Sequence, residues 1–174
     1  MRIGQSVTLT GRCITKHMAS KVNEIVAGKY DHKGESVVYG DTDSVYFSAY
    51  KTLQKEINEG LIPWTKDSVL GLYDKIAEEV NGSFKSFMTR AFHTPSTRGE
   101  VIAAGRELVA SKGLFITKKR YAVLYYDKEG KRADVEGKDG KMKAMGLDLK
   151  RSDTPVFVQD FLSDLLYMVL QGKE

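Results

Sequence analysis

Two short β-rich runs flanking a Gly-Asp-Thr-Asp centre constrain the fold of this 174-residue chain more than any other feature of its sequence. The runs are 36–39 and 44–47, and both consist mainly of valine and aromatic residues. Two strand-forming runs separated by a short polar break are typical of a β-hairpin. The sequence therefore predicts a hairpin over about 36–48, with Asp41 and Asp43 near its tip.

Three other segments place apolar residues at the spacing of an amphipathic helix. The predicted helices cover 6–27, 67 to about 92, and about 155–171. Pro155 suits the first position of the last helix, and Asp153 or Thr154 suits its N-cap.

The remaining apolar segments favour strands. Short strands are predicted over 101–104 and 108–110, and one long basic strand over about 113–126, where β-branched and aromatic residues are frequent. An antiparallel partner strand is predicted from Arg132 onward. The order of elements indicates an α+β fold, in which helices pack on an antiparallel sheet.

Charge is distributed unevenly along the chain. The net charge is +4, but the segment 111–151 holds 12 Lys/Arg against 6 Asp/Glu. Clustered basic charge favours a polyanion such as nucleic acid as a partner, and a solvated lysine-rich surface is an equally good explanation of the charge alone. One cysteine, no signal peptide and no membrane-length apolar run lead us to expect a soluble, cytoplasmic protein without a membrane partner.

Asp41 and Asp43 offer carboxylate oxygens, which are the ligands that Mg²⁺ prefers. Two-metal sites held by acidic residues catalyse phosphoryl transfer. An isolated Asp-x-Asp, however, is often only a turn, because aspartate side chains bond to nearby backbone. The same pattern with a divalent ion also occurs in glycosyltransferases that bind nucleotide sugars, which is a second enzymatic alternative.

The residues around this pair carry a more specific signal. The segment Val37–Tyr46 resembles motif C of family B DNA polymerases. Segments 6–11 and 21–24 resemble the helix that precedes motif C in that family. Segment 117–121 resembles the basic Lys-Lys-Arg-Tyr motif that follows motif C. Segments 142–147 and 152–155 resemble the region downstream of that basic motif in polymerases of the T-even phage type.

The resemblance implies a role for each matching residue of the acidic segment. Asp43 corresponds to the aspartate that ligates metal, and Asp41 to its acidic companion. Thr42 is implied to lie near the primer end. Glu107 corresponds to a carboxylate near the metals, with a surface ion pair on the sheet as the alternative.

The resemblance also implies a DNA-contacting surface. Lys118, Lys119, Arg120 and Tyr121 are implied to contact primer-template DNA, Lys119 in the minor groove, where every base pair presents an acceptor. Lys143 is a second candidate for the groove or the phosphates. On one continuous strand, Lys118 and Arg120 would face one side, and Lys119 and Tyr121 the other. The alternative is an edge strand whose lysines discourage aggregation.

Taken together, the resemblance implies that 1–174 is a partial palm domain of a DNA-directed DNA polymerase, with Mg²⁺ as cofactor and deoxynucleoside triphosphates as substrates. The family's motifs A and B, its exonuclease acids and its thumb have no match in this chain. We therefore expect the isolated chain to be inactive, and to be completed by a second chain or by the remainder of a longer polymerase. A non-catalytic module that binds primer-template DNA is the remaining alternative.

Overall fold

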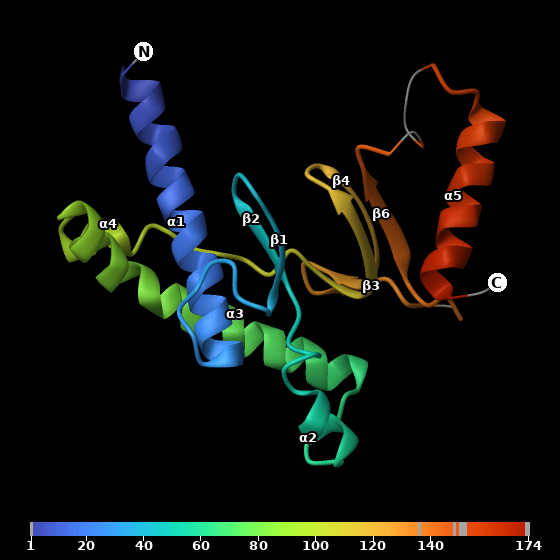
Figure 1. Ribbon diagram of the computed structural model, residues 1–174, viewed down its shortest axis with the longest axis horizontal. Helices are drawn as coiled ribbons and strands as arrows, with labels where there is room; N and C mark the ends of the chain where they lie inside the picture. Colours follow the sequence, from blue (N-terminus) through green and yellow to red (C-terminus); the bar gives the residue numbers. More distant parts are fainter. Residues whose placement is uncertain (1, 136, 148, 150–152, 173–174) are drawn as a thin grey trace. The chain divides into compact units, whose positions relative to one another are not determined.

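The protein is described by a computed structural model that covers residues 2–135, 137–147, 149 and 153–172 (Figure 1). It contains two compact units, 1–105 and 106–174, each of which combines helices with antiparallel strands. The predicted α+β class is therefore confirmed. Three residues used in the sequence analysis lie outside the described residues. They are Ser152, from the segment 152–155, and Lys150 and Arg151, the last two basic residues of the segment 111–151.

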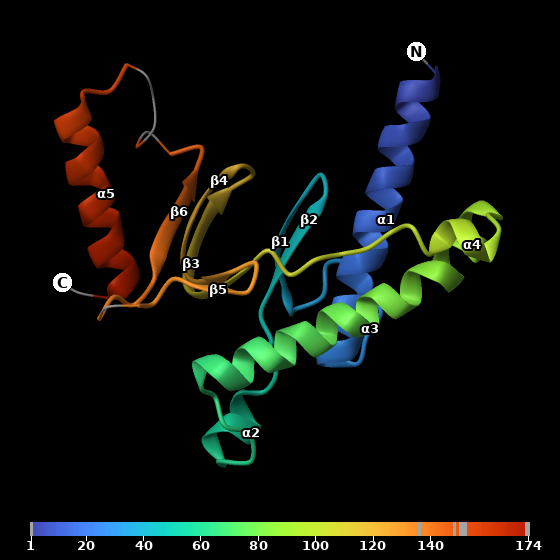
Figure 2. The ribbon, with the colours of Figure 1, turned by 180° about the vertical axis from the view of Figure 1, so that it is seen from behind.

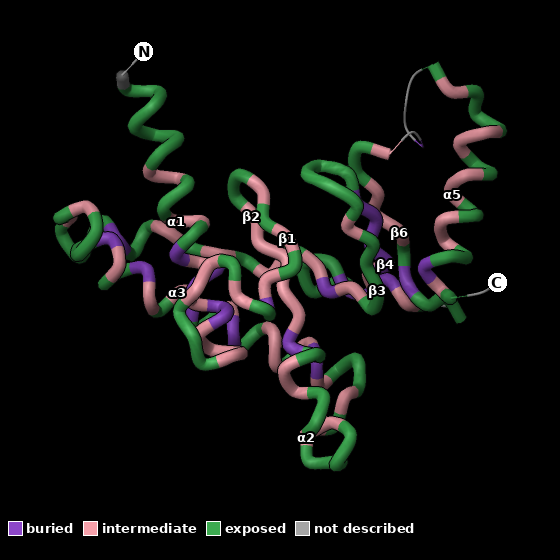
Figure 3. The backbone as a smooth tube through the Cα atoms, in the orientation of Figure 1, coloured by how far each residue is buried: buried purple, intermediate pink, exposed green. Residues whose placement is uncertain are grey.

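Two long helices build the core of the first unit. They are α1 (Arg2–Ala27) and α3 (Lys66–Phe92), and Figure 3 shows buried segments on both. Val22 of α1 packs against Ile76, Val80 and Phe84 of α3. Burial of one such side chain stabilises a fold by about 1.5–3 kcal/mol, so this cluster is what holds the two helices together.

The predicted boundaries of these helices are nearly those observed. Helix α1 starts four residues earlier than predicted and ends where Gly28 adopts a positive φ of 73°. Helix α3 starts one residue early, at a capping box in which Thr65 accepts from the Ser68 amide and the Ser68 hydroxyl accepts from the Thr65 amide. Two short helices, α2 (Gln54–Asn58) and α4 (Ser96–Gly99), lie on either side of α3 in the sequence.

A two-stranded hairpin completes the first unit. Strands β1 (Val37–Asp41) and β2 (Ser44–Phe47) are antiparallel, and a register irregularity lies at the exposed Val38. Phe47 packs on Tyr73 of α3, with ring centroids 5.2 Å apart. The predicted hairpin is confirmed, and its apolar side is joined to the helical core.

The strand predicted over 101–104 is wrong. These residues form no strand, because the side chain of Asn81 takes the place of a neighbouring strand. Its Oδ1 accepts from the Ala104 amide (2.7 Å), and its Nδ2 donates to the Ala104 carbonyl (2.9 Å). Ile102 and Ala104 instead pack on the helical core.

The second unit is a four-stranded antiparallel sheet with one helix. Its strands are β3 (Leu108–Thr117), β4 (Arg120–Lys128), β5 (Lys131–Arg132) and β6 (Lys141–Met145). Strand β4 is central and pairs with the other three, as Figure 2 shows from behind. Helix α5 (Val156–Gln171) packs on this sheet, where Leu170 contacts Ala122 and Leu124.

The single long strand predicted over 113–126 is wrong. The chain turns back at Lys118 and Lys119, so that β3 and β4 form a second hairpin with Thr117 opposite Arg120. The predicted return strand after Arg132 does exist, since β6 pairs with β4 along Tyr121–Tyr125.

The predicted N-cap of the last helix is also wrong. Pro155 occupies the N-cap position with an extended backbone, and α5 begins one residue after it. The Thr154 carbonyl accepts from Gln159 Nε2 at 2.8 Å, and this hydrogen bond joins the residues just before the helix to its first turns. No helix among the described residues is both long enough and apolar enough to cross a lipid bilayer.

Candidate active site and nucleic-acid interface

The acidic tip, which consists of Asp41, Thr42 and Asp43, is a tight turn at the end of the first hairpin. Asp41 pairs with Ser44, so only Thr42 and Asp43 lie in the turn. One carboxylate oxygen of Asp41 accepts from the amide of Thr42 (2.9 Å) and from its hydroxyl (3.3 Å). Asp43 is exposed, and its carboxylate makes no hydrogen bond or ion pair with any described residue. Asp41 therefore stabilises the turn, and Asp43 is free to take a ligand.

Helix α1 holds the acidic tip in place. The hydroxyl of Thr15 lies 2.9 Å from the carbonyl oxygen of Thr42 and 3.0 Å from the Gly11 carbonyl of its own helix. This contact joins residues 27 positions apart. The helical pattern of the sequence gives no sign of it, because a threonine on a helix most often bonds only within that helix.

Asn23 of α1 holds the other end of the same hairpin. Its Oδ1 accepts from the Ser36 amide (3.2 Å) and hydroxyl (2.6 Å), and its Nδ2 donates to the Lys29 carbonyl (2.7 Å). Asn23 is 1% exposed, and a Cβ built on Gly34 would overlap its amide group. The loop that leads into β1 is therefore locked around one buried side chain.

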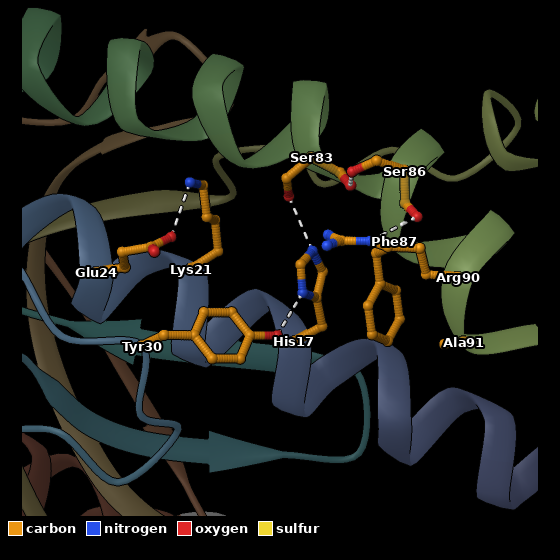
Figure 4. A pocket seen from close by; sticks show the side chains of 9 residues that line it. All are labelled: His17, Lys21, Glu24, Tyr30, Ser83, Ser86, Phe87, Arg90 and Ala91. Carbon is orange, nitrogen blue, oxygen red and sulfur yellow. Dashed lines mark hydrogen bonds and ion pairs between the residues drawn. The ribbon is translucent and has the colours of Figure 1, made fainter.

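A pocket of about 610 Å³ lies between α1 and α3, beside His17 (Figure 4). His17 Nδ1 lies 2.7 Å from the Tyr30 hydroxyl and Nε2 lies 2.9 Å from Ser83 Oγ, while Phe87 stacks on the ring at 3.9 Å. Burial, and then the positive charges of Lys21 and Arg90, lower the pKa of His17 below its usual value. His17 is thus a neutral packing residue near neutral pH.

The structure brings two of the predicted site residues together in the second unit. Glu107, directly before β3, accepts from Lys143 Nζ of β6 at 2.6 Å. The two side chains are 49% and 29% exposed, so the pair contributes about 1 kcal/mol or less. It opens at little cost when either partner meets a stronger ligand. The observed pair is the surface ion pair that was the alternative for Glu107.

A buried ion pair fixes the backbone beside Glu107. Arg106 donates to Asp127 of β4, whose side chain is 3% exposed and also accepts from the Gly130 amide (3.2 Å). The carbonyl of Glu107 accepts from the Glu129 amide at 2.8 Å. Asp127 was not singled out by its sequence context, because its partner is 21 residues away.

The basic tip, which consists of Lys118, Lys119 and Arg120, is the turn of the second hairpin. All three side chains are exposed. Lys119 has a left-handed backbone with φ of 61°, which costs a non-glycine residue about 1 kcal/mol. Because the basic segment is a turn and not a strand, the predicted division of its side chains between two faces of a strand does not apply.

Tyr121 does not belong to this exposed surface. It is 4% exposed, and its ring stacks on Phe115 of β3 with centroids 5.6 Å apart. A ring buried in this way supports the base of the basic tip and offers no face to DNA, so the predicted contact of Tyr121 with DNA is replaced by a packing role.

The described residues contain no group of three or more His, Cys, Asp or Glu side chains that could hold a metal ion. The chemistry of the acidic tip nevertheless suits Mg²⁺, since it offers hard carboxylate oxygens and one of its carboxylates has no protein partner among the described residues. Among the described residues, no third His, Cys, Asp or Glu side chain joins Asp41 and Asp43 in such a group.

Comparison with known proteins identifies relatives that share the whole chain. No protein-family model matches it. The chain is 32% identical to the DNA-directed DNA polymerase of Escherichia phage RB69 and 27% identical to that of Enterobacteria phage T4, in each case over its entire length. It is also 27% identical to the DNA polymerase delta catalytic subunit of Glycine max.

The chain spans 20% of the length of the two phage polymerases and 13% of the Glycine max subunit. The matches run through both hairpins, so the acidic and the basic tips lie within the shared region. Over its whole length, the chain is therefore homologous to one segment of the family B DNA polymerases.

Proposed function

We propose that the chain is part of the palm of a DNA-directed DNA polymerase. In this proposal the acidic tip supplies part of the catalytic metal site, and the basic tip holds primer-template DNA. The observation that carries the proposal is the exposed carboxylate of Asp43, at the end of a hairpin braced at both ends by α1. A braced hairpin suits catalysis because reacting groups must be held to within a fraction of an ångström.

The proposed reaction joins a deoxynucleotide to a primer. The primer 3′-hydroxyl oxygen loses its proton to water and bonds to the α-phosphorus of a deoxynucleoside triphosphate, the bond from that phosphorus to the bridging oxygen breaks, and pyrophosphate leaves. Mg²⁺, when bound, neutralises the charge on the phosphates and on the attacking and leaving oxygens.

Each residue of the acidic tip has a separate task in this proposal. Asp43 would hold Mg²⁺ directly, because its carboxylate is exposed and has no partner among the described residues. Asp41 keeps one oxygen on the Thr42 amide and so fixes the turn. Thr42, exposed at the end of the hairpin, would contact the primer terminus. Glu107 would approach the metals only after its ion pair with Lys143 opens.

The basic tip would bind DNA without reading its sequence. Ammonium groups of Lys118 and Lys119 suit phosphate oxygens and the acceptors that every base pair presents in the minor groove. Arg120 would add a third positive charge, and Lys143 a fourth once it separates from Glu107. Binding of this kind weakens steeply with salt, because each phosphate contact releases counterions.

The site is completed, in this proposal, by parts of a polymerase outside this chain. Two carboxylates cannot hold two metal ions in working geometry, so the chain by itself should not extend primers. Helix α5 also exposes large apolar side chains, including Phe157 (76%) and Phe161 (65%). Such a surface favours contact with a second chain or with the remainder of the polymerase.

A hybrid polymerase tests the catalytic proposal. In it, this chain replaces the matching segment of the RB69 phage polymerase, and primer extension is measured with Mg²⁺. We expect extension by the hybrid, and a loss of about 1,000-fold or more in Asp43→Asn, because a bound metal supplies several kcal/mol of transition-state stabilisation. DNA binding should be unchanged. Glu79→Gln, an exposed acid on α3, is the matched control and should extend normally.

The incomplete metal set favours one other function, a non-catalytic DNA-binding module. A hybrid that binds primer-template DNA but never extends it, beside an active RB69 parent, would support that module and contradict catalysis. A nucleotide-sugar transferase is disfavoured, since every strand pair among the described residues is antiparallel, whereas those enzymes place their Asp-x-Asp on a sheet of parallel strands.

A further inference from the structure

Gly146 lies directly after β6 and makes an unusually close contact with the basic tip. Its φ is 65°, and a Cβ built on it would overlap the carbonyl oxygen of Lys119 and lie 3.1 Å from Cγ of Arg120. No side chain fits at this position unless the tip or the strand moves. The absence of a side chain therefore permits the contact between β6 and the basic tip.

A hydrogen bond ties the same two segments together. Arg120 Nε donates to the Gly146 carbonyl at 3.1 Å, and the next pair along the strands is Tyr121 with Met145. The two contacts involve both residues on the β4 side of the turn, Lys119 through its carbonyl and Arg120 through its guanidinium group. The end of β6 thus supports the tip through backbone packing and a hydrogen bond together.

The supported residue has a strained backbone. Lys119, Glu129 and His93 are the non-glycine residues with positive φ among those the structure describes. His93 ends α3, and Glu129 shares its turn with Gly130, where an added Cβ would meet open space. Lys119 is different, because a close contact from another strand presses on its peptide group. A strained residue persists where the surrounding structure determines its conformation.

We infer that Gly146 is a positioning residue for the basic tip: the contact of Gly146 with the Lys119 carbonyl holds the left-handed turn from which Lys118 and Lys119 project toward primer-template DNA. This inference rests on the proposed function, because it assumes that the basic tip binds DNA. Gly146 itself has no side chain to contact DNA, and it acts through the backbone of Lys119.

Gly140 offers a matched control at the other end of the same strand. Its φ is 145°, and a Cβ there would overlap the carbonyl oxygen of Tyr125 on β4. Gly140→Ala and Gly146→Ala therefore introduce the same kind of clash with a carbonyl group, one at each end of β6. Only Gly146→Ala disturbs the basic tip.

The test measures DNA binding by the 174-residue chain and its two glycine variants. Fluorescence anisotropy with a labelled primer-template duplex gives Kd at several NaCl concentrations, and urea unfolding gives the fraction folded. We expect both variants to lose stability, while Gly146→Ala alone raises Kd by about fivefold. The salt dependence of its binding should also become shallower, by about 0.9 in the log–log slope for each phosphate that the displaced tip no longer neutralises.

A second pair of variants covers the case in which Gly146→Ala does not fold. Arg120→Lys keeps the positive charge but removes the Nε donor to Gly146, and should raise Kd by about twofold to fivefold through the displaced tip. Arg132→Lys, at an exposed position of β5, is its control and should bind as the wild type does.

The outcomes separate the two proposals. Absence of salt-dependent binding by the wild-type chain would contradict the DNA-binding function and the inference with it. Wild-type binding with equal Kd values for Gly146→Ala and Gly140→Ala, or for Arg120→Lys and Arg132→Lys, would contradict the positioning role alone.

Discussion

The acidic and the basic tips sit on hairpins with turns of the same length, yet different parts of the structure hold them. In the first hairpin the closing pair is Asp41 with Ser44, and in the second it is Thr117 with Arg120. Neither turn residue of the acidic tip has a positive φ, whereas Lys119 of the basic tip does.

The supports differ in kind as well. The acidic hairpin is an isolated two-stranded sheet, and side chains of α1 hydrogen-bond to both of its ends. The basic hairpin belongs to a four-stranded sheet, and its tip is held by the backbone of the neighbouring β6. An isolated hairpin is marginally stable in water, so the acidic one needs a helix, while the basic one uses its sheet.

The largest expected difference between the two hairpins comes from removing the buried side-chain amide of Asn23, which lies beneath the acidic hairpin. In Asn23→Ala, the buried Ser36 amide and the partly buried Lys29 carbonyl lose their partner, so we expect the free energy of unfolding of the first unit to fall by about 2–3 kcal/mol. Trp64, the only tryptophan, lies in this unit, and its fluorescence in urea gives the measurement.

Asn58→Ala, at the exposed end of α2, is the control for that experiment and should change stability by less than about 0.5 kcal/mol. Amide hydrogen exchange in β4 should be the same in both variants. An equal loss of protection in the two units of Asn23→Ala would show that the side chain does not act on the acidic hairpin in particular.

At the basic tip, we expect loss of a positive charge to weaken DNA binding, without the change in stability expected at the acidic hairpin. In Lys119→Ala, we expect Kd for primer-template DNA to rise about tenfold at constant salt, because the variant lacks one positive group whose interaction with DNA contributes about 1.4 kcal/mol. Lys128→Ala, at the end of β4 far from the turn, removes the same charge from the same hairpin. If both substitutions weaken binding equally, the sheet binds DNA through its net charge and the basic tip has no special part.

A smaller effect is expected where α1 meets the acidic tip. Thr15→Val keeps the shape of the side chain but removes the hydrogen bond to Thr42, which contributes about 1 kcal/mol. We expect faster amide exchange at 40–45, measured by NMR. Thr8→Val removes a hydroxyl that bonds only within α1, to Gly4, and should leave that exchange unchanged. Equal exchange rates in the two variants would remove Thr15 as a support.

The smallest expected effect is that of pH on stability, and it should concern the first unit only. The pKa of folded His17 is lowered below the unfolded value of about 6.5, chiefly by burial, so the unfolded chain binds more protons as pH falls through that range. Stability that is present above about pH 6.5 is therefore lost below it. In urea titrations followed by Trp64, this loss should be smaller in His17→Gln, and an unchanged pH dependence would contradict it.

The sequence predicted the two hairpins with very different success. The acidic hairpin was correctly located, because a Gly-Asp break between valine- and tyrosine-rich runs is a local signal that needs no tertiary contact. For the basic hairpin the sequence predicts one long strand instead, because Lys118 and Lys119 are not turn-forming residues. The one available sign was length, since a 14-residue strand greatly exceeds the usual 5–6 residues.

The site residues divide in the same way. The sequence proposes Asp41 and Asp43 in one segment and Lys118, Lys119 and Arg120 in another as candidates, because each segment is continuous along the chain and resembles a family motif. The ion pair between Glu107 and Lys143 and the burial of Tyr121 could not, because they depend on which strands become neighbours.

Local chemistry specifies the features that are predictable from the sequence: the long helices through the spacing of apolar residues, the acidic hairpin through its turn, and the relationship to DNA polymerases through motif residues that lie side by side. The position of the turn in the basic segment depends instead on contacts between distant parts of the chain. A left-handed lysine is unfavourable by itself, and it becomes acceptable only because Gly146, 27 positions further along the chain, leaves room for its carbonyl group.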